Sequence, residues 1–73
     1  MDNFKEKVGK TIKVLRMNQK KTRDALACEA GISSRFLYEI ETGKKGMSAE
    51  TLYGLARALE ASADYILSVD DVK

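Results

Sequence analysis

The amino-acid sequence predicts an all-α domain built from five short helices. Apolar residues recur at intervals of three and four, which is the period of one helix face, and no segment shows the period of a strand. A Ser or Thr stands in front of four of these segments, at the position of a helix N-cap. The chain has five Gly and no Pro, so we expect its helices to end at caps and glycines.

The first two helices are predicted within residues 3–30. The first runs from about Asn3 to Met17. Its apolar stripe consists of Phe4, Val8, Ile12 and Leu15. Polar residues 18–21 interrupt the pattern, and Thr22 then offers an N-cap for a second helix that ends at Ala30. The side chains expected to face the core from this helix are Ala25, Leu26 and Ala30.

The third helix is predicted after a tight turn. Gly31 stands where a left-handed C-cap is expected, and Ile32 is placed to plug the turn. Ser33 offers the next N-cap, for a helix from Ser34 to Glu41 that is followed by Gly43. The buried side chains of this helix are expected to be Phe36, Leu37 and Ile40.

Two further helices complete the prediction. Ser48 caps a fourth helix after the loop 44–47, and Ser62 caps a short fifth helix. The expected inward face of the fourth helix consists of Leu52, Leu55, Ala56 and Leu59. The fifth helix carries Tyr65, Ile66 and Leu67.

Length and composition narrow the possible functions. A chain of 73 residues fits a single domain over 1–73, with a core over about 4–67 and a flexible tail over 68–73. The sequence has no His and a single cysteine, Cys28, which argues against a serine triad, an internal disulfide and a multi-cysteine zinc site. No apolar run approaches the roughly 20 residues of a membrane span. We therefore expect no enzyme, metal site, cofactor or membrane partner.

Charge is unevenly distributed along the chain. The formal net charge is +2, but residues 1–45 hold eleven of the 13 basic residues, and residues 46–73 hold five of the 11 acids. A basic front and an acidic back suit a protein that turns one side toward a polyanion, although two ordinary solvated faces produce the same pattern. Taken alone, the asymmetry favours nucleic acid weakly.

Residues 22–44 have the features of a helix-turn-helix unit, in which two short helices are joined by a tight turn containing glycine. Ala27 falls where the two helices cross, and a large side chain there would separate them. Gly31 permits the sharp reversal, and Ile32 and Leu37 are placed to hold the second helix against the first.

This segment resembles the Cro/phage-repressor-like (XRE) helix-turn-helix family, whose pattern is T-Q-E-x-L-A-x-x-x-G-I-S-x-x-x-L-S-x-I-E-x-G-K. The residues that meet the pattern are Thr22, Leu26, Ala27, Gly31, Ile32, Ser33, Leu37, Ile40, Glu41, Gly43 and Lys44. The likeness extends over roughly residues 8–67. The chain departs from the family at Lys21 (usually apolar), Arg23 (usually Gln), Met47 (usually Pro) and Glu60 (usually Gly). The resemblance implies a five-helix lambda-repressor-like DNA-binding domain.

The resemblance also implies which residues meet DNA, because in this family the third helix enters the major groove. The base-contacting positions fall on Ser34, Arg35, Tyr38 and Glu39. Arg35 matches guanine N7 and O6 through its forked donors, whereas Glu39 either accepts from cytosine N4 or holds Arg35 in position. The alternative is that Arg35 and Glu39 form an ordinary i,i+4 surface pair.

Other positions are expected to contact phosphate or to support the fold. The expected phosphate contacts are Thr22, Arg23, Ser33, Lys44 and Lys45. Arg16 and Glu41 occupy positions that pair in the family as a partly buried salt bridge, which ties the first helix to the end of the third. Cys28 lies beside Glu29, which disfavours a thiolate, so an inert thiol is favoured over a redox sensor.

The sequence thus predicts a sequence-specific regulator of transcription, a repressor, that binds a near-palindromic site on double-stranded DNA as a homodimer. The expected dimer contact comes from Tyr65, Leu67 and Val69. We expect a cytoplasmic, nucleoid-associated protein of a prokaryote, phage or mobile element, with no small-molecule ligand because the length leaves no room for a sensor domain. The rival hypothesis is a protein-interaction module, such as an antitoxin-like or anti-repressor subunit, that keeps the fold without specific DNA binding.

Overall fold

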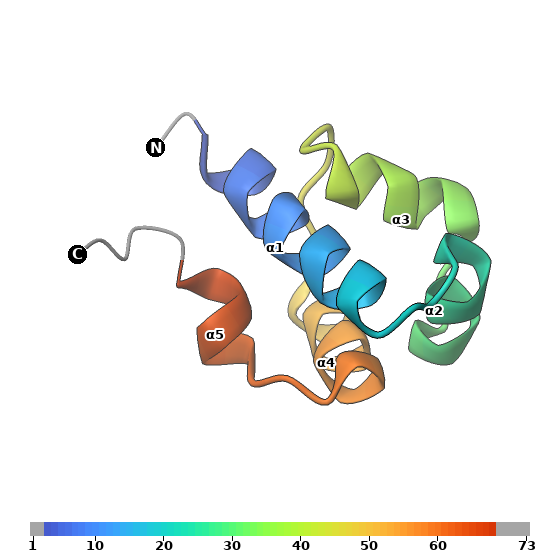
Figure 1. Cartoon of the computed structure of the whole chain (residues 1–73). Helices are drawn as coiled ribbons and strands as arrows, with labels where there is room; N and C mark the ends of the chain where they lie inside the picture. The colour runs from blue at the N-terminus through green and yellow to red at the C-terminus, as the bar shows by residue number, and fades with distance from the viewer. Residues whose placement is uncertain (1–2, 69–73) are drawn as a thin grey trace.

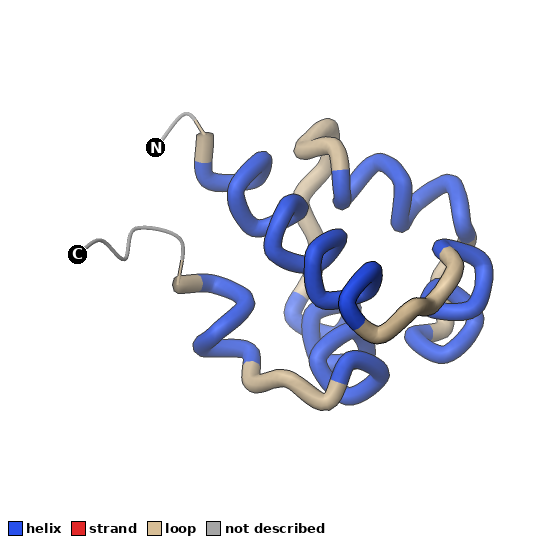
Figure 2. The backbone as a smooth tube through the Cα atoms, in the orientation of Figure 1, coloured by secondary structure: helices blue, strands red, loops and turns tan. Residues whose placement is uncertain are grey.

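The computed structural model describes residues 3–68 and contains five α-helices in that range (Figure 1). The helices are α1 (Phe4–Asn18), α2 (Arg23–Ala30), α3 (Ser34–Glu41), α4 (Ala49–Leu59) and α5 (Ala63–Leu67). Residues 3–68 contain no strand, and loops alone join the helices (Figure 2). The structure therefore confirms the predicted all-α class, and the helix bounds differ from the predicted ones by about one residue.

The predicted N-caps account for where four of the helices begin. The hydroxyl oxygens of Thr22, Ser33, Ser48 and Ser62 each accept the backbone N–H three residues further on, at 3.0–3.1 Å. Such a cap satisfies one of the four N–H groups that a helix N-terminus leaves without an internal partner. α1 begins after Asn3, which makes no side-chain cap hydrogen bond.

Helix α1 crosses the middle of the molecule and contacts α3 on one side and α5 on the other (Figure 1). α2 packs against α4 and α3, and α4 also contacts α5 and α1. α3 and α5 therefore lie on different sides of α1. The molecule measures 32 × 22 × 20 Å along its principal axes.

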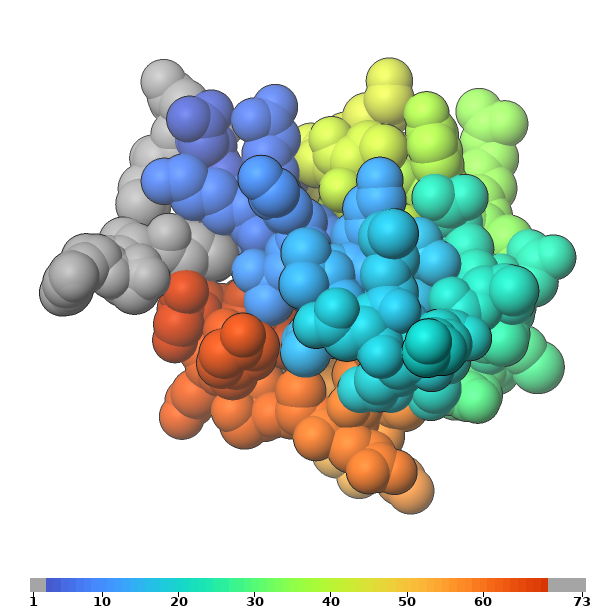
Figure 3. All heavy atoms as spheres, in the orientation of Figure 1, coloured from blue at the N-terminus to red at the C-terminus, as the bar shows by residue number. Residues whose placement is uncertain are grey.

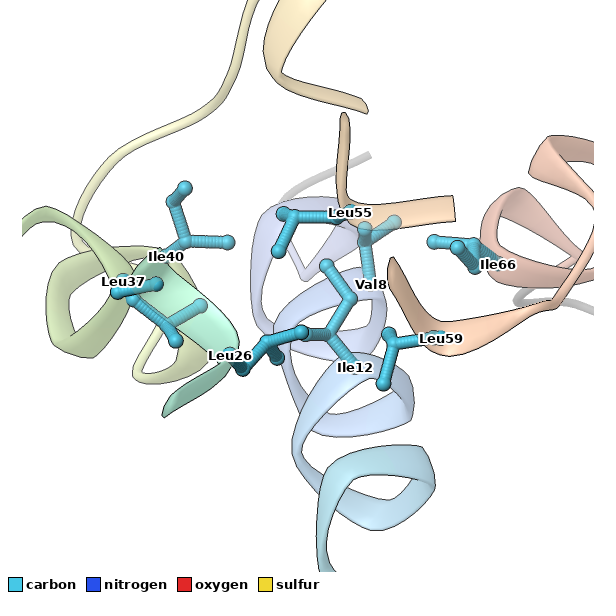
Figure 4. Close-up of a cluster of buried hydrophobic side chains, with 9 residues drawn as sticks. Val8, Ile12, Leu26, Leu37, Ile40, Leu55, Leu59 and Ile66 are labelled. Atoms are coloured by element: carbon cyan, nitrogen blue, oxygen red, sulfur yellow. The ribbon is translucent and has the colours of Figure 1, made fainter. Parts of the chain in front are cut away.

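The core lies where the inward faces of all five helices meet, and Figure 4 shows its larger side chains. Its buried members are Val8, Ile12, Leu26, Ala27, Leu37, Ile40, Leu55, Leu59 and Ile66. Burial of apolar surface, worth about 25 cal/mol per Å², is the main force that holds so small a domain together. Phe36, Leu52 and Ala56 pack against this core and are half-buried.

The prediction that Ala25 faces the core was wrong, because this residue is exposed. Successive residues of a helix are turned by about 100°, so Leu26, Ala27 and Ala30 share one side of α2 while Ala25 lies nearly opposite. A helix of two turns has room for one buried side only.

Two glycines allow the path that the chain takes around α2 and α3. Gly31 has φ 77° and ends α2 in the left-handed conformation, as predicted. Gly9 lets α1 approach the end of α3: a Cβ atom at this position would lie 2.1 Å from the carbonyl oxygen of Ile40. The helix that precedes the helix-turn-helix therefore meets its second helix backbone to backbone.

In the described part of the chain, two residues other than glycine adopt the left-handed backbone conformation, Lys20 with φ 58° and Glu60 with φ 55°. Glu60 ends α4 with φ 55°, in the left-handed region where side chains with a Cβ atom are strained by roughly 1–2 kcal/mol. This is the position at which the sequence departs from the glycine usual in the family.

Within residues 3–68, no helix combines the length and the apolar character needed to cross a bilayer. The same part of the chain holds no cluster of three or more His, Cys, Asp or Glu residues placed to bind a metal ion.

Candidate nucleic-acid interface

Helix α3 divides its side chains between the core and the surface. Leu37, Ile40 and Glu41 are buried, whereas the Arg35 side chain is 87% exposed. Tyr38, one turn further on the same face, is also exposed. In the space-filling view, the surface of α3 and of the loop after it lies along one edge of the molecule, away from α5 (Figure 3). α3 therefore offers a polar face to a partner while its other face belongs to the core.

Glu39 is held between two cations. Its carboxylate oxygens lie 3.5 Å from Nε of Arg35 and 3.4 Å from Nζ of Lys45, and its side chain is only 17% exposed. The i,i+4 pair of Arg35 and Glu39 thus exists in the protein without DNA. The same carboxylate also joins α3 to the loop that follows it.

The polar residues at the start of α2 and α3 are engaged with their own chain. The oxygens of Thr22 and Ser33 act as helix caps, and the Ser34 hydroxyl donates a hydrogen bond to the carboxylate of Asp24. Each helix still has further first-turn N–H groups that no helix carbonyl can pair, and these groups attract anions. The two N-termini retain a place for phosphate even with their caps formed.

Glu41 lies at the centre of a buried charge cluster that joins three segments. Its carboxylate accepts hydrogen bonds from Arg16 Nε at 2.7 Å and Arg16 Nη2 at 3.2 Å. It also accepts one from Arg23 Nε at 3.2 Å. Arg16 donates through Nη1 to the carbonyl oxygen of Lys21 as well, at 3.0 Å. Side-chain exposure is 1% for Glu41 and 10% for Arg16, so the cluster ties α1 to the end of α3 in a largely dry site.

Arg23 takes a part in this cluster that the sequence did not reveal. Besides donating to Glu41, its guanidinium lies 5.3 Å from the centre of the Tyr38 ring, a cation–π distance. The side chain is 35% exposed, so its outer N–H groups still reach solvent. The signal available in the sequence was the replacement of the family's glutamine by a residue with a longer reach and a planar charge.

A second feature missed at the sequence level is the support that the segment after α1 gives to α4. The Gln19 side chain donates to the carbonyl oxygen of Leu59 at 2.7 Å, and Lys21 Nζ donates to that of Ala58 at 2.8 Å. Lys21 also pairs with Glu29 at 2.7 Å. These bonds satisfy carbonyl groups that the C-terminus of α4 leaves free. Lys21, which replaces an apolar residue of the family pattern, gains a polar partner at this place.

The charges near α3 are predominantly positive at the surface. Lys44 and Lys45, in the loop after α3, are exposed, as is Arg35. The two acids of α3 are covered, because Glu41 is buried and Glu39 lies beneath two cations. The outward electrostatics of this region are therefore more basic than the sequence alone indicates.

Two of the three residues predicted for a dimer contact lie on α5, away from this face. Tyr65 and Leu67 of α5 are 58% and 38% exposed, and Val69 falls outside the residues that the structure describes. A shallow apolar groove runs along α4 to the start of α5. Its lining residues include Leu52, Tyr53, Ala56, Ala61 and Ala63. Cys28 is exposed on α2.

The short paired helices, the glycine turn and the outward basic face of α3 define a helix-turn-helix DNA-binding domain. A family model described as "Helix-turn-helix domain" matches residues 9–72. The chain belongs to the Cro/phage-repressor-like (XRE) family of helix-turn-helix proteins, whose fold is that of DNA-binding transcription regulators.

Solved structures of regulators resemble the domain over most of its length. The clp gene regulator ClgR from Corynebacterium glutamicum is 31% identical, with a TM-score of 0.82 over 88% of this chain and 83% of that chain. The c2 repressor of P22, solved in complex with a synthetic operator, is 30% identical, with a TM-score of 0.81 over 86% of this chain and 96% of that chain.

A third structure shares the fold at lower identity. The restriction-modification controller protein C.AhdI from Aeromonas hydrophila is 23% identical, with a TM-score of 0.81 over 84% of this chain and 92% of that chain. Among curated protein sequences, none matches the chain significantly.

Proposed function

We propose that the protein is a sequence-specific double-stranded-DNA-binding regulator of transcription that acts as a repressor, with α3 in the major groove. The observation that carries this proposal is the outward face of α3, where the Arg35 side chain is 87% exposed and its neighbouring acids are covered. A guanidinium fork matches guanine N7 and O6, which line the major groove. The likeness to a repressor solved on a synthetic operator supports the same reading.

The contacts divide into two groups by the chemistry of the residues. The base-contacting group consists of Ser34, Arg35 and Tyr38, with Glu39 beside them either to accept from cytosine N4 or to hold Arg35 in position. The phosphate-contacting group consists of Thr22, Arg23, Ser33, Lys44 and Lys45. Lys44 and Lys45 are exposed, and Arg23 has outer N–H groups at the N-terminus of α2, where an anion is favoured. Arg16 and Glu41 hold α3 on α1 and do not meet DNA in this proposal.

The proposed active form is a homodimer on a near-palindromic site. One copy of so small a domain contacts too little DNA for operator-level specificity. Exposed Tyr65 and Leu67 on α5 supply apolar surface on a different side of α1 from α3. The longest dimension of the molecule is 32 Å. On such a site the α3 helices of two copies that meet at α5 would lie about 34 Å apart, one turn of DNA.

The rival function, a protein-interaction module without specific DNA binding, requires a neutral or acidic α3 surface. Glu39 and Glu41 were the residues that favoured it. Glu41 has a side-chain exposure of 1% and Glu39 one of 17%, and both are paired with cations. This observation favours DNA as the partner.

The proposal is tested by selecting a randomised duplex pool with the full chain at two salt concentrations. Arg35→Ala is selected in parallel, with Arg57→Ala as a control that removes the same charge from exposed α4 surface. We expect the parent and Arg57→Ala to enrich one near-palindromic site and Arg35→Ala to lose it. Binding that ignores sequence and disappears with added salt would leave phosphate attraction alone and would refute the proposal.

A further inference from the structure

The contacts of Glu39 bear on how α3 reads DNA, given the function proposed above. A carboxylate that reads cytosine must present a free oxygen to the N4 amino group. In this protein both oxygens of Glu39 face cations, Oε2 toward Arg35 and Oε1 toward Lys45, and the side chain is largely covered. Glu39 is therefore already paired before DNA arrives.

The same contact determines which donors Arg35 has left. Glu39 faces Nε, one edge of the guanidinium, at 3.5 Å. The two Nη groups at the end of the fork stay free to donate side by side, and the side chain is 87% exposed. Two parallel donors in a plane are the complement of guanine O6 and N7. A freely rotating arginine would lose more conformational entropy on binding than one already held on its helix face.

The other surface polar residues of α3 have fewer donors available for a DNA base. The Ser34 hydroxyl donates to Asp24, and the ring of Tyr38 is covered on one face by the guanidinium of Arg23. Arg35 is thus the residue of α3 with the largest donor set directed away from the protein.

We propose that Glu39 is a positioning residue that aims the end of the Arg35 fork at one guanine, so each half-site contains a guanine whose identity depends on both side chains. Glu39 itself reads no base. Its second contact, with Lys45, keeps its charge neutralised beside the DNA phosphates.

The test uses the site obtained by selection, with the guanine replaced in turn by 7-deazaguanine, which lacks N7, and by inosine, which keeps N7 and O6. The proteins compared are the parent, Arg35→Ala and Glu39→Gln. Glu50→Gln serves as a control because it removes the same charge from an exposed position on α4. Affinity for each duplex and for a random duplex is measured at one salt concentration.

For the parent we expect a preference of about 5- to 150-fold for guanine over other bases at this position, the range of one bidentate pair. 7-Deazaguanine should weaken binding and inosine should not. Glu39→Gln should shrink the guanine preference several-fold while its affinity for random DNA stays equal or rises, because a negative charge has gone. Glu50→Gln should keep the full preference.

Four results would count against these expectations. A guanine preference unchanged in Glu39→Gln would overturn the proposal, and so would the loss of a separate cytosine preference in that variant, because Glu39 would then be a base reader. A selected site with no guanine that depends on Arg35 would overturn this inference alone. Selection of no site at all by the parent would refute the proposed function and this inference with it.

Discussion

Removal of Glu41 should cost the domain a large part of its stability. The Glu41 carboxylate is 1% exposed and accepts three hydrogen bonds, two from Arg16 and one from Arg23. In the wild-type protein the Arg16 side chain is 10% exposed. Glu41→Ala leaves its guanidinium in this largely buried place with no anion beside it. Loss of one partner from a buried ion pair costs about 3–5 kcal/mol, because the other charge stays desolvated. Arg23 is partly exposed and adds little to this loss.

That loss is large compared with the total free energy of unfolding of the domain. At roughly 0.05–0.15 kcal/mol per residue, a domain of this length has a free energy of unfolding on the order of 4–11 kcal/mol. Each kcal/mol shifts the Tm of a domain this small by about 4–8 °C, so Glu41→Ala should melt at least about 12 °C lower. Thermal and urea unfolding followed by circular dichroism at 222 nm measure both quantities.

A double variant separates the cost of an unpaired buried charge from the cost of lost side-chain volume. Arg16→Met combined with Glu41→Leu removes both buried charges and keeps side-chain volume. We expect it to regain most of the lost stability, since apolar pairs commonly replace buried ion pairs at little cost. If Glu41→Ala instead lowers stability by less than about 1 kcal/mol, the pair behaves as a surface pair and our account of the cluster is wrong.

Three further stability predictions can be checked by the same unfolding measurements. Glu60→Gly should stabilise the domain by about 1 kcal/mol, because it relieves the left-handed strain at the end of α4, and an unchanged or lower Tm would contradict this. Gly9→Ala should destabilise by about 1–3 kcal/mol in spite of alanine's better helix propensity, since its Cβ atom would collide with the carbonyl oxygen of Ile40. A stabilised variant would show that α1 can move away from α3. Lys21→Met should cost about 1 kcal/mol by removing the donor to the Ala58 carbonyl, and a neutral result would mean that water replaces this bond.

The helices were predictable because local chemistry determines them. Thr22, Ser33 and Gly31 act through neighbours three or four residues away, and the structure has them as caps where the sequence placed them. The prediction that Ala25 is buried failed for a geometric reason. Small apolar residues occur on both sides of this two-turn helix, and the sequence does not show which side packs against the core.

The site was less predictable because its contacts join distant segments. Arg23 reaches Glu41 across 18 positions of sequence, and Lys21 reaches Ala58 across 37. Both residues depart from the family pattern, so the pattern marked them as unusual without saying what they touch. The covered state of Glu39 depends on how the loop after α3 brings Lys45 back to it, and this loop path is set by the tertiary structure.

The shared carboxylate of Glu39 also constrains how descendants of this protein can acquire new binding sites. Replacement of Arg35 alone would leave a carboxylate with one cation fewer, close to where we place the DNA backbone, and replacement of Glu39 alone would loosen the arginine. Either single substitution would weaken binding to the original DNA site without improving binding to a new one. In diverging copies of the gene, positions 35 and 39 should therefore change together, and libraries built to retarget the protein should vary them as a pair.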